Sequence, residues 1–147
     1  MKVSTKGRYG LRAMVDMAIN SVGDHVSIKS IAERQDVSEN YLEQVFSSLR
    51  KANLVKSVKG FKGGYLLSKN PSEITVGEVV RALEGDIDIV DNNEQPNDGN
   101  NLENIISKVV WSKINQVINN TIDSITLEAL AEEYRKICSR DSYIYYI

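Results

Sequence analysis

The 147-residue sequence contains a single cysteine, Cys138, and a single histidine, His25. One cysteine cannot close an intrachain disulfide, and it cannot supply the several thiolates of a typical iron–sulfur or structural zinc site. A Ser–His–Asp or Cys–His catalytic group would have to use His25, which lies in the turn-like segment Gly23-Asp24-His25. We therefore expect no enzyme activity, no metal and no cofactor.

Long apolar stretches are also missing. No run approaches the roughly 18 residues that span a bilayer, and residues 1–20 lack the apolar core and cleavage site of a signal peptide. The expectation is a cytoplasmic protein without a membrane segment. The hydrophobic content of 41% is nevertheless enough for a buried core.

The chain as a whole has no large excess of positive or negative charge, since its formal net charge is −2. That value alone argues against a nucleic-acid binder, but the charges are unevenly distributed. Residues 1–70 carry a net charge of +6, whereas residues 71–147 carry −8. Such an asymmetry indicates an anionic partner for the first half of the chain.

Three helices are predicted in the first 52 residues. Apolar residues recur at helical spacing over residues 4–22, a short helix follows the N-cap candidate Ser27, and a third follows Ser38 and runs to about Ala52. Two β-prone runs, 54–58 and 65–68, then flank a tip with three glycines in six residues, which predicts a hairpin. The fold class expected is mainly α with a small β-hairpin wing, that is, a winged helix-turn-helix domain.

The third helix has an apolar stripe and an opposite polar stripe. The apolar one consists of Leu42, Val45, Phe46 and Leu49, and the polar one of Asn40, Glu43, Gln44 and Ser47. One α-helix fits the major groove of DNA, where amides pair with adenine and a glutamate accepts from cytosine. A polar stripe alone is an ordinary solvent-exposed helix face, so the lysine-bearing wing and the local charge of +6 decide in favour of DNA. The candidate DNA-binding residues are Ser38, Asn40, Tyr41, Glu43, Gln44, Arg50, Lys51, Lys56, Lys59, Gly60, Lys62, Gly63 and Gly64.

The second half is organised differently. Thr75-Val76-Gly77-Glu78 is a capping box that begins a helix ending at Gly85, and residues 86–101 form an acidic segment expected to be a flexible loop. The longest helix is predicted from Leu102 to about Ser124, and a last helix begins near Thr126 and leaves a tail from Ser142. The expected units are 1–85, 86–101 and 102–147.

A family resemblance follows from several segments taken together. These are Thr5-Lys6-Gly7-Arg8-Tyr9-Gly10, Val37 to Phe46, Leu49 to Val55, Gly60 to Leu67, and Thr75 to Val80. In combination they resemble the bacterial winged helix-turn-helix transcriptional regulators typified by IscR, NsrR and CymR. The likeness covers nearly the whole chain.

The resemblance implies a homodimeric repressor of transcription that reads a palindromic operator in double-stranded DNA. It places base reading on Ser38, Asn40, Glu43 and Gln44, and wing contacts on Lys59 and its glycine neighbours. It also implies that the long helix and the first helix together build the dimer. The candidate dimerisation residues are Ile106, Val109, Val110, Ile114, Val117 and Ile118.

One departure from the family pattern narrows the expected function. Iron–sulfur members carry three cysteines in the segment that corresponds to residues 86–101, and this chain has none there. It is therefore similar to the cluster-free CymR branch, repressors of cysteine metabolism that act with cysteine synthase (O-acetylserine thiol-lyase). The residues Tyr145, Tyr146 and Ile147 are candidates for binding that partner, since an isoleucine with a free carboxylate suits capture in a pocket.

Three alternatives remain open at the level of sequence. A regulator of the same fold could respond to a metabolite or to oxidation, with a dimer-interface pocket or Cys138 as the sensor, although a lone cysteine is more often a small hydrophobic residue. A protein-interaction module without DNA binding is another alternative. A small enzyme is the third, but no nucleophile–base pair or metal-ligand cluster supports it.

Overall fold

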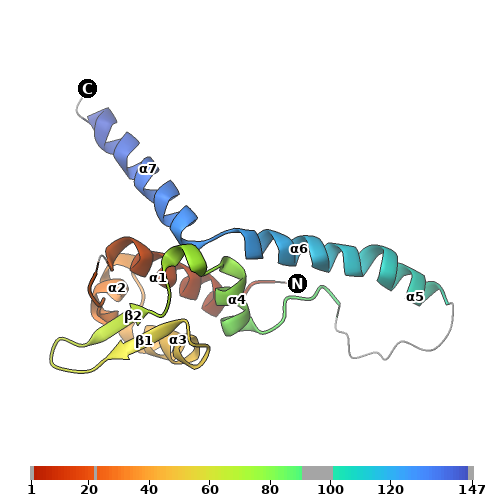
Figure 1. Ribbon diagram of the computed structural model, residues 1–147, viewed down its shortest axis with the longest axis horizontal. Coiled ribbons are helices and arrows are strands. Elements are labelled where there is room, and N and C mark those ends of the chain that lie inside the picture. Colours follow the sequence, from red (N-terminus) through yellow and green to blue (C-terminus); the bar gives the residue numbers. More distant parts are fainter. Residues whose placement is uncertain (1, 22, 91–100, 146–147) are drawn as a thin grey trace.

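Helices and one antiparallel hairpin make up the described part of the chain (Figure 1). The computed structural model describes residues 2–21, 23–90 and 101–145, with side chains as far as Arg140. The elements are α1 (Thr5–Asn20), α2 (Ile28–Gln35), α3 (Glu39–Lys51), β1 (Val55–Val58), β2 (Gly64–Leu67), the 3-10 turn η1 (Pro71–Glu73), α4 (Val76–Glu84), α5 (Leu102–Ile106), the π-helical segment η2 (Ser107–Trp111), α6 (Ser112–Ser124) and α7 (Leu127–Tyr145).

Local capping signals determine where the first three helices begin. The hydroxyls of Ser4, Ser27 and Ser38 accept hydrogen bonds from backbone N–H groups three residues later, as expected for N-caps. Asp36 adopts a left-handed conformation (φ 54°) that ends α2 and begins the turn to α3. The predicted helix-turn-helix is therefore present at the predicted residues.

The core lies where α1, α2, α3, β1, α4 and the start of α7 meet. Fully buried side chains from these elements include Met14, Met17, Ile31, Leu42, Val45, Phe46, Leu49, Val55, Val79 and Leu127. The close approach of α1 and α4 depends on two glycines of α1, because a Cβ at Gly7 would meet the Glu84 side chain and one at Gly10 would meet Leu83. We call this unit, residues 5–84 with the first turns of α7, the body.

The wing is a two-stranded antiparallel hairpin with register Val55↔Leu67 to Val58↔Gly64. It is followed by η1 and then by α4, which Thr75 caps by accepting from the N–H of Glu78 at 3.1 Å. The Glu78 carboxylate contacts Lys69 Nζ at 3.3 Å. Of the two hydrogen bonds of the predicted capping box, the one accepted by the Thr75 hydroxyl is therefore the one seen. Gly85 (φ 82°) ends α4 as predicted.

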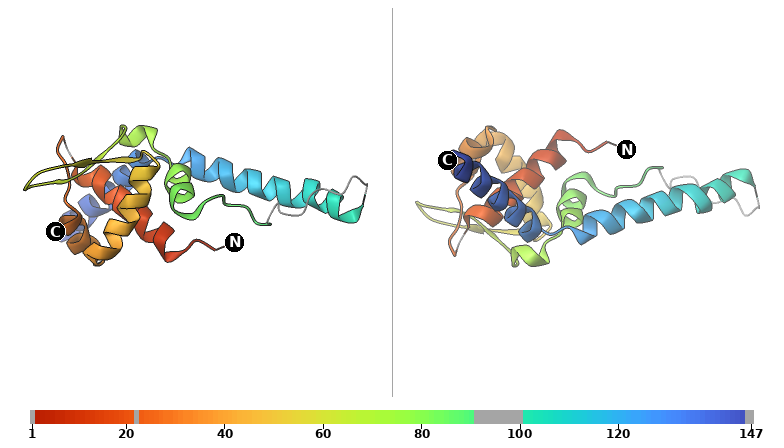
Figure 2. Two further views of the ribbon diagram at one scale, coloured as in Figure 1. Left: turned by 90° about the horizontal axis from the view of Figure 1, so that it is seen from below. Right: turned by 90° about the horizontal axis from the view of Figure 1, so that it is seen from above.

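A continuous helical segment, α5–η2–α6, extends from the body over Leu102–Ser124, and we call it the arm (Figures 1 and 2). The sequence predicts an unbroken α-helix here, but Ser107–Trp111 is π-helical. None of the arm residues is fully buried, although many are apolar. Helix spacing alone does not predict a π segment, in which the backbone hydrogen bonds join residues i and i+5.

The last helix is longer than the sequence predicts. A tail was expected from Ser142, whereas α7 continues to Tyr145. Extending an existing helix is favourable because it fixes only one residue per added hydrogen bond. Cys138 is exposed on α7. No helix in the described ranges has the length and apolar character needed to cross a bilayer.

Candidate nucleic-acid interface

The two faces of α3 differ completely in burial. Leu42, Val45, Phe46 and Leu49 are 0% exposed and attach the helix to the core. Asn40, Glu43 and Gln44 are exposed on the opposite side. Ser47, the fourth residue of the predicted polar stripe, is half-buried. The helix therefore presents two amides and one carboxylate to an external ligand while its other face fixes their position.

Ser38 and Tyr41 differ from the other candidate DNA-binding residues of α3, because both already make contacts within the protein. Ser38 is exposed, but its hydroxyl already accepts from the Tyr41 N–H at 3.2 Å. Tyr41 packs edge-on against Tyr9, with ring centroids 6.2 Å apart, and its hydroxyl is enclosed without a hydrogen-bond partner in the described structure. Tyr41 thus points toward α1 and does not join the exposed polar face.

The wing is braced against the body. Val26 and Tyr65 exchange two backbone hydrogen bonds of 2.9 Å, and the Tyr65 ring lies 4.8 Å from that of Phe46. A Cβ at Gly64 would meet the carbonyl oxygen of Val26, so only glycine allows this close pairing. The hairpin consequently has a fixed direction relative to α3.

The basic candidates surround this face. Arg50 and Lys51 are exposed in the last turn of α3, and Lys56, Lys59 and Lys62 are exposed on the wing. Gly60 is exposed at the tip with φ 130°, and Gly63 and Gly64 are half-buried. Figure 2 shows α3 and the hairpin together at the front of the view from below, whereas α7 is at the front in the view from above.

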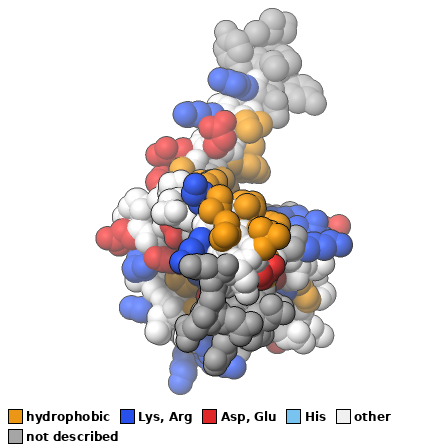
Figure 3. Space-filling model, turned by 90° about the vertical axis from the view of Figure 1, so that its right-hand side faces the viewer, with side chains coloured by type: hydrophobic (Ala, Val, Ile, Leu, Met, Phe, Trp, Pro, Cys, Tyr) orange, Lys and Arg blue, Asp and Glu red, His pale blue; other side chains and the backbone are white. Residues whose placement is uncertain are grey.

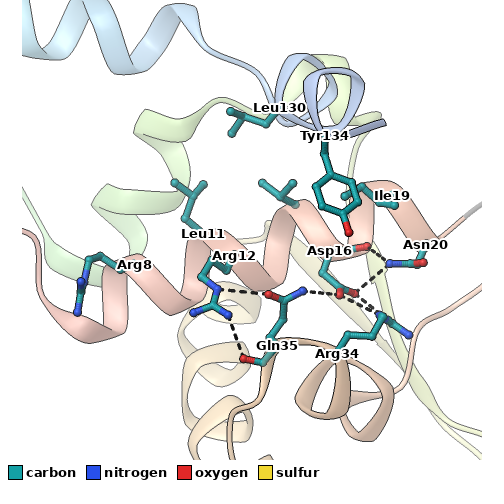
Figure 4. A pocket seen from close by; sticks show the side chains of 11 residues that line it. Arg8, Leu11, Arg12, Asp16, Ile19, Asn20, Arg34, Gln35, Leu130 and Tyr134 are labelled. Carbon is teal, nitrogen blue, oxygen red and sulfur yellow. Dashed lines mark hydrogen bonds and ion pairs between the residues drawn. The ribbon is translucent and has the colours of Figure 1, made fainter. Parts of the chain in front are cut away.

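A polar network that the sequence analysis missed connects α1 to the helix-turn-helix (Figure 4). Asp16 of α1 is 3% exposed and accepts from Arg34 at 2.7 and 2.9 Å and from Gln35 Nε2 at 2.9 Å. The hydrogen bond with Asp16 raises the pKa of Arg34. Arg12 donates to the Gln35 carbonyl at 3.0 Å and lies 4.7 Å above the Tyr9 ring. The sequence signal that could have predicted this network is Asp16 itself, an acidic residue on the apolar face of the first helix.

The same network borders a cavity of about 560 Å³ between α1, α2 and α7 (Figure 4). Its apolar lining comes from Leu11, Val15, Ile19, Leu130 and Tyr134, and its polar lining includes Arg8, Arg12, Asp16 and Arg34. It lies beside the helix-turn-helix and away from the wing. No candidate residue from the sequence analysis lines it.

The candidate dimerisation residues form an apolar strip on the arm. Val109, Val110, Ile114 and Val117 are 54%, 37%, 37% and 63% exposed, and Ile106 and Ile118 are half-buried. Figure 3 looks toward the tip of the arm and shows hydrophobic side chains gathered on one side of it. Of the candidate partner-binding residues, Tyr145 ends α7, and Tyr146 and Ile147 lie outside the described residues.

The base of the arm is fastened to the body by an ion pair and backbone hydrogen bonds. Arg81 of α4 contacts Asp123 of α6 at 2.7 and 2.9 Å and lowers the pKa of that carboxyl. A Cβ at Gly77 would meet the Asp123 carboxylate, so this glycine makes room for the pair. The Val76 N–H donates to the Ile125 carbonyl at 2.8 Å, and Leu127 donates to Ile74 at 2.9 Å.

Comparison with known proteins gives a consistent result. Residues 3–133 match the family model Rrf2, described as an iron-dependent transcriptional regulator. The chain is 41% identical over 149 residues to the HTH-type transcriptional regulator CymR of Bacillus subtilis, covering 100% of both chains. It is 39% identical over 132 residues to IscR of Pectobacterium atrosepticum, covering 88% of this chain and 79% of that protein.

Solved structures agree with this assignment. The structure of CymR, the global cysteine regulator of B. subtilis, superposes with a TM-score of 0.75 over 90% of this chain and 98% of that one, at 41% identity. The oxidized form of Staphylococcus aureus CymR gives a TM-score of 0.70 at 39% identity, covering 90% and 97%. These relatives are regulators rather than enzymes, and they share the predicted winged fold. The chain is a transcriptional regulator and belongs to the Rrf2 family.

Proposed function

We propose that this regulator is a repressor that binds a palindromic operator in double-stranded DNA as a homodimer. The observation that carries the proposal is the exposed row Asn40, Glu43 and Gln44 on a helix whose other face is fully buried, beside a braced wing with Lys59 and Lys62. A helix held in this way can enter the major groove and read base edges. The lysines then neutralise backbone phosphates.

In this proposal residues 1–85 are the DNA-binding domain, residues 86–101 connect it to the second half, and residues 102–147 provide dimerisation and partner contacts. Glu43 and Gln44 discriminate bases, and Ser38 positions the helix on the backbone near its N-terminus. The charge of +6 on residues 1–70 attracts DNA. The charge of −8 on residues 71–147 favours keeping that half away from the duplex.

The test compares two single variants on selected and on random duplexes. Lys59→Ala should weaken binding to both and reduce the slope of log K against log salt by about 0.9. Glu43→Ala should lose about 1–3 kcal/mol of discrimination while random binding is retained. An equal loss of selected and random binding in Glu43→Ala would contradict base reading. If the wild type binds no duplex at low or high salt, the proposed DNA binding is contradicted. The alternative of a protein-interaction module is then favoured.

Dimerisation through the arm is supported by its apolar strip. Val109 and Val117 are more than half exposed, and the apolar arc along the arm is wider than contact with α4 requires. A parallel or antiparallel partner arm would remove this surface from water. Sedimentation velocity at micromolar and nanomolar concentration measures the expected dimer, and a monomer at all concentrations would contradict it.

Control of cysteine and sulfur metabolism genes is the regulon that we infer. It is supported by 41% identity over the full chain to a protein whose solved structure is described as that of a global cysteine regulator. The absence of cysteine from residues 86–101 supports operation without an iron–sulfur cluster. Genome-wide recovery of bound DNA tests the regulon, and sites that avoid sulfur-assimilation genes would contradict it.

Cysteine synthase is the proposed protein partner, contacted through Tyr145, Tyr146 and Ile147. The support is the aromatic and apolar character of these residues together with the position of Tyr145 at the end of a helix that extends from the body. Deleting the three residues and titrating with cysteine synthase tests the proposal. Unchanged affinity would overturn it, and unchanged operator binding by the shortened chain is the control.

A second candidate function is a regulator of this fold that responds to a metabolite or to oxidation. The cavity of about 560 Å³ favours a metabolite, because its lining joins apolar side chains to guanidinium groups beside the helix-turn-helix. A hydrogen bond with the exposed Cys138 raises the pKa of Tyr134 at its rim. Thermal shifts with free amino acids, compared between wild type and a Leu130→Trp variant that fills the cavity, test the first input. Peroxide treatment before operator binding tests the second.

A further inference from the structure

The tip of the wing carries a bulky aromatic side chain with no packing partner in the described structure. Phe61 is 104% exposed, which is the highest exposure among the large hydrophobic residues described. Single exposed apolar residues are common on protein surfaces. This one differs because it lies between two exposed lysines, Lys59 and Lys62, on an element held in a fixed direction.

The tip has little freedom of its own. The Gly63 N–H donates to the Gly60 carbonyl at 3.0 Å, and a Cβ on Gly63 would lie 2.6 Å from the Val58 carbonyl oxygen. Behind the tip, the Val26–Tyr65 hydrogen bonds and the Phe46–Tyr65 ring contact join the hairpin to the core. The hairpin is therefore held against the body, and its tip presents an uncovered aromatic ring to a ligand.

A cleft of about 550 Å³ lies directly beside Phe61, between the wing and the start of α2. Its lining includes the side chains of Lys29, Lys62, Ser27 and Ser30, and that of Arg34, whose guanidinium is paired with Asp16. No aspartate or glutamate belongs to the lining, although the chain as a whole has more acidic than basic residues. Such a cleft suits a phosphate of a nucleic-acid backbone.

We propose that the wing reads the minor groove through Phe61: the ring enters the groove as an apolar wedge, while Lys29 and Lys62 hold a phosphate of the bordering strand in the cleft. This inference rests on the proposed DNA binding and names two residues, Phe61 and Lys29, outside the candidate set. Apolar wedges partly unstack a base step and kink the duplex. The 2-amino group of guanine projects into the minor groove and hinders such a wedge, so the wing disfavours G·C pairs at this contact.

The experiment uses the full-length chain and two alternating duplexes, poly(dI-dC) and poly(dG-dC). They present the same major groove and differ only by the guanine 2-amino group in the minor groove. The wild type should bind poly(dI-dC) about fivefold more tightly. In Phe61→Ala this preference should fall below about twofold, and Phe61→Leu, which keeps an apolar wedge, should retain most of it.

Two further variants separate the ring from charge and from the hairpin itself. Lys29→Ala should reduce the salt slope by about 0.9 and keep the preference for poly(dI-dC). Leu66→Ala, a matched exposed apolar residue on β2, should change neither quantity. The inference is overturned if the wild type binds both duplexes equally, or if Phe61→Ala keeps the wild-type preference. A wild type that binds neither duplex would instead refute the proposed DNA binding.

Discussion

The body and the arm differ in how far their apolar side chains are buried. The body encloses its apolar side chains within one chain, so that Met14, Phe46 and Leu49 are 0% exposed. The arm has apolar residues at similar density, yet Leu102 is 72% exposed and Val117 63% exposed. The body thus encloses its own core, whereas the arm leaves large apolar side chains exposed in the described structure.

This contrast has a physical meaning for function. A helix whose exposed face is strongly apolar is typical of an interface. In the proposed homodimer, the body holds the candidate base-reading residues in place, and the arm sets the distance between the two bodies. The following substitutions test this difference between the body and the arm, in order of decreasing expected effect.

Removing a core ring should harm the body most. Phe46→Ala deletes a fully buried side chain that contacts Tyr65 of the wing, and should lower the free energy of unfolding by about 3–5 kcal/mol. Urea denaturation followed by circular dichroism measures the loss. A decrease below about 1 kcal/mol would show that the body core is more adaptable than its burial indicates.

Placing charge on the arm should separate the dimer without unfolding the body. Val109→Asp with Val117→Asp should raise the dimer dissociation constant at least about 100-fold, equivalent to about 2.7 kcal/mol, because the carboxylates would be desolvated in the interface. Sedimentation velocity measures the dimer and near-ultraviolet circular dichroism the body. The exposed substitution Lys108→Asp, which is not at i±3 or i±4 spacing from Val109 or Val117, is the charge control. Equal dissociation in it would argue against the apolar strip.

Breaking the buried network should have an intermediate effect. Asp16→Ala leaves Arg34 and Gln35 without their shared acceptor and should cost about 1–3 kcal/mol, since the Arg34 side chain is 38% exposed and can regain water. Operator affinity should also fall, because Gln35 directly precedes the turn to α3. Replacing Asp24, an exposed acid on the following turn, provides the control. An unchanged affinity would mean that the network does not position the recognition helix.

The pair at the base of the arm should have the smallest effect. Arg81→Gln should cost at most about 1 kcal/mol, because Asp123 is 45% exposed and solvent screens the pair. The pair lowers the pKa of Asp123. The stability that the ion pair adds is therefore fully present above the ordinary carboxyl pKa of about 4. It is lost as the pH falls through the lowered pKa of Asp123. Amide exchange of α6 at pH 7 and pH 3 measures this difference, and Asp123→Asn should abolish it.

Sequence reasoning succeeds here where the signal is local. The caps Ser27, Ser38 and Thr75, the glycine-rich tip and the stop at Gly85 each involve groups a few residues apart. Their hydrogen bonds form in any context that permits the helix or hairpin. For the same reason the opposite stripes of α3 could be assigned from spacing alone.

It fails where two distant segments meet. Sequence alone does not show that the candidate Tyr41 packs against Tyr9 of α1, and Asp16 has no visible partner until α2 lies beside α1. Gly77 reads as part of a cap, but the space that it leaves is filled by the carboxylate of Asp123, 46 positions later in the chain. None of these contacts follows from helical periodicity.

The sequence by itself determined the order of helices and hairpin, the family and the separation of charge into a basic and an acidic half, because composition and short-range hydrogen bonding carry that information. Only the tertiary structure decided which side chains remain free to meet a ligand. Burial is a property of packed surfaces rather than of single positions. That is why the exposure of Phe61 at the wing tip, and of Val109 and Val117 on the arm, could be assigned only from the structure.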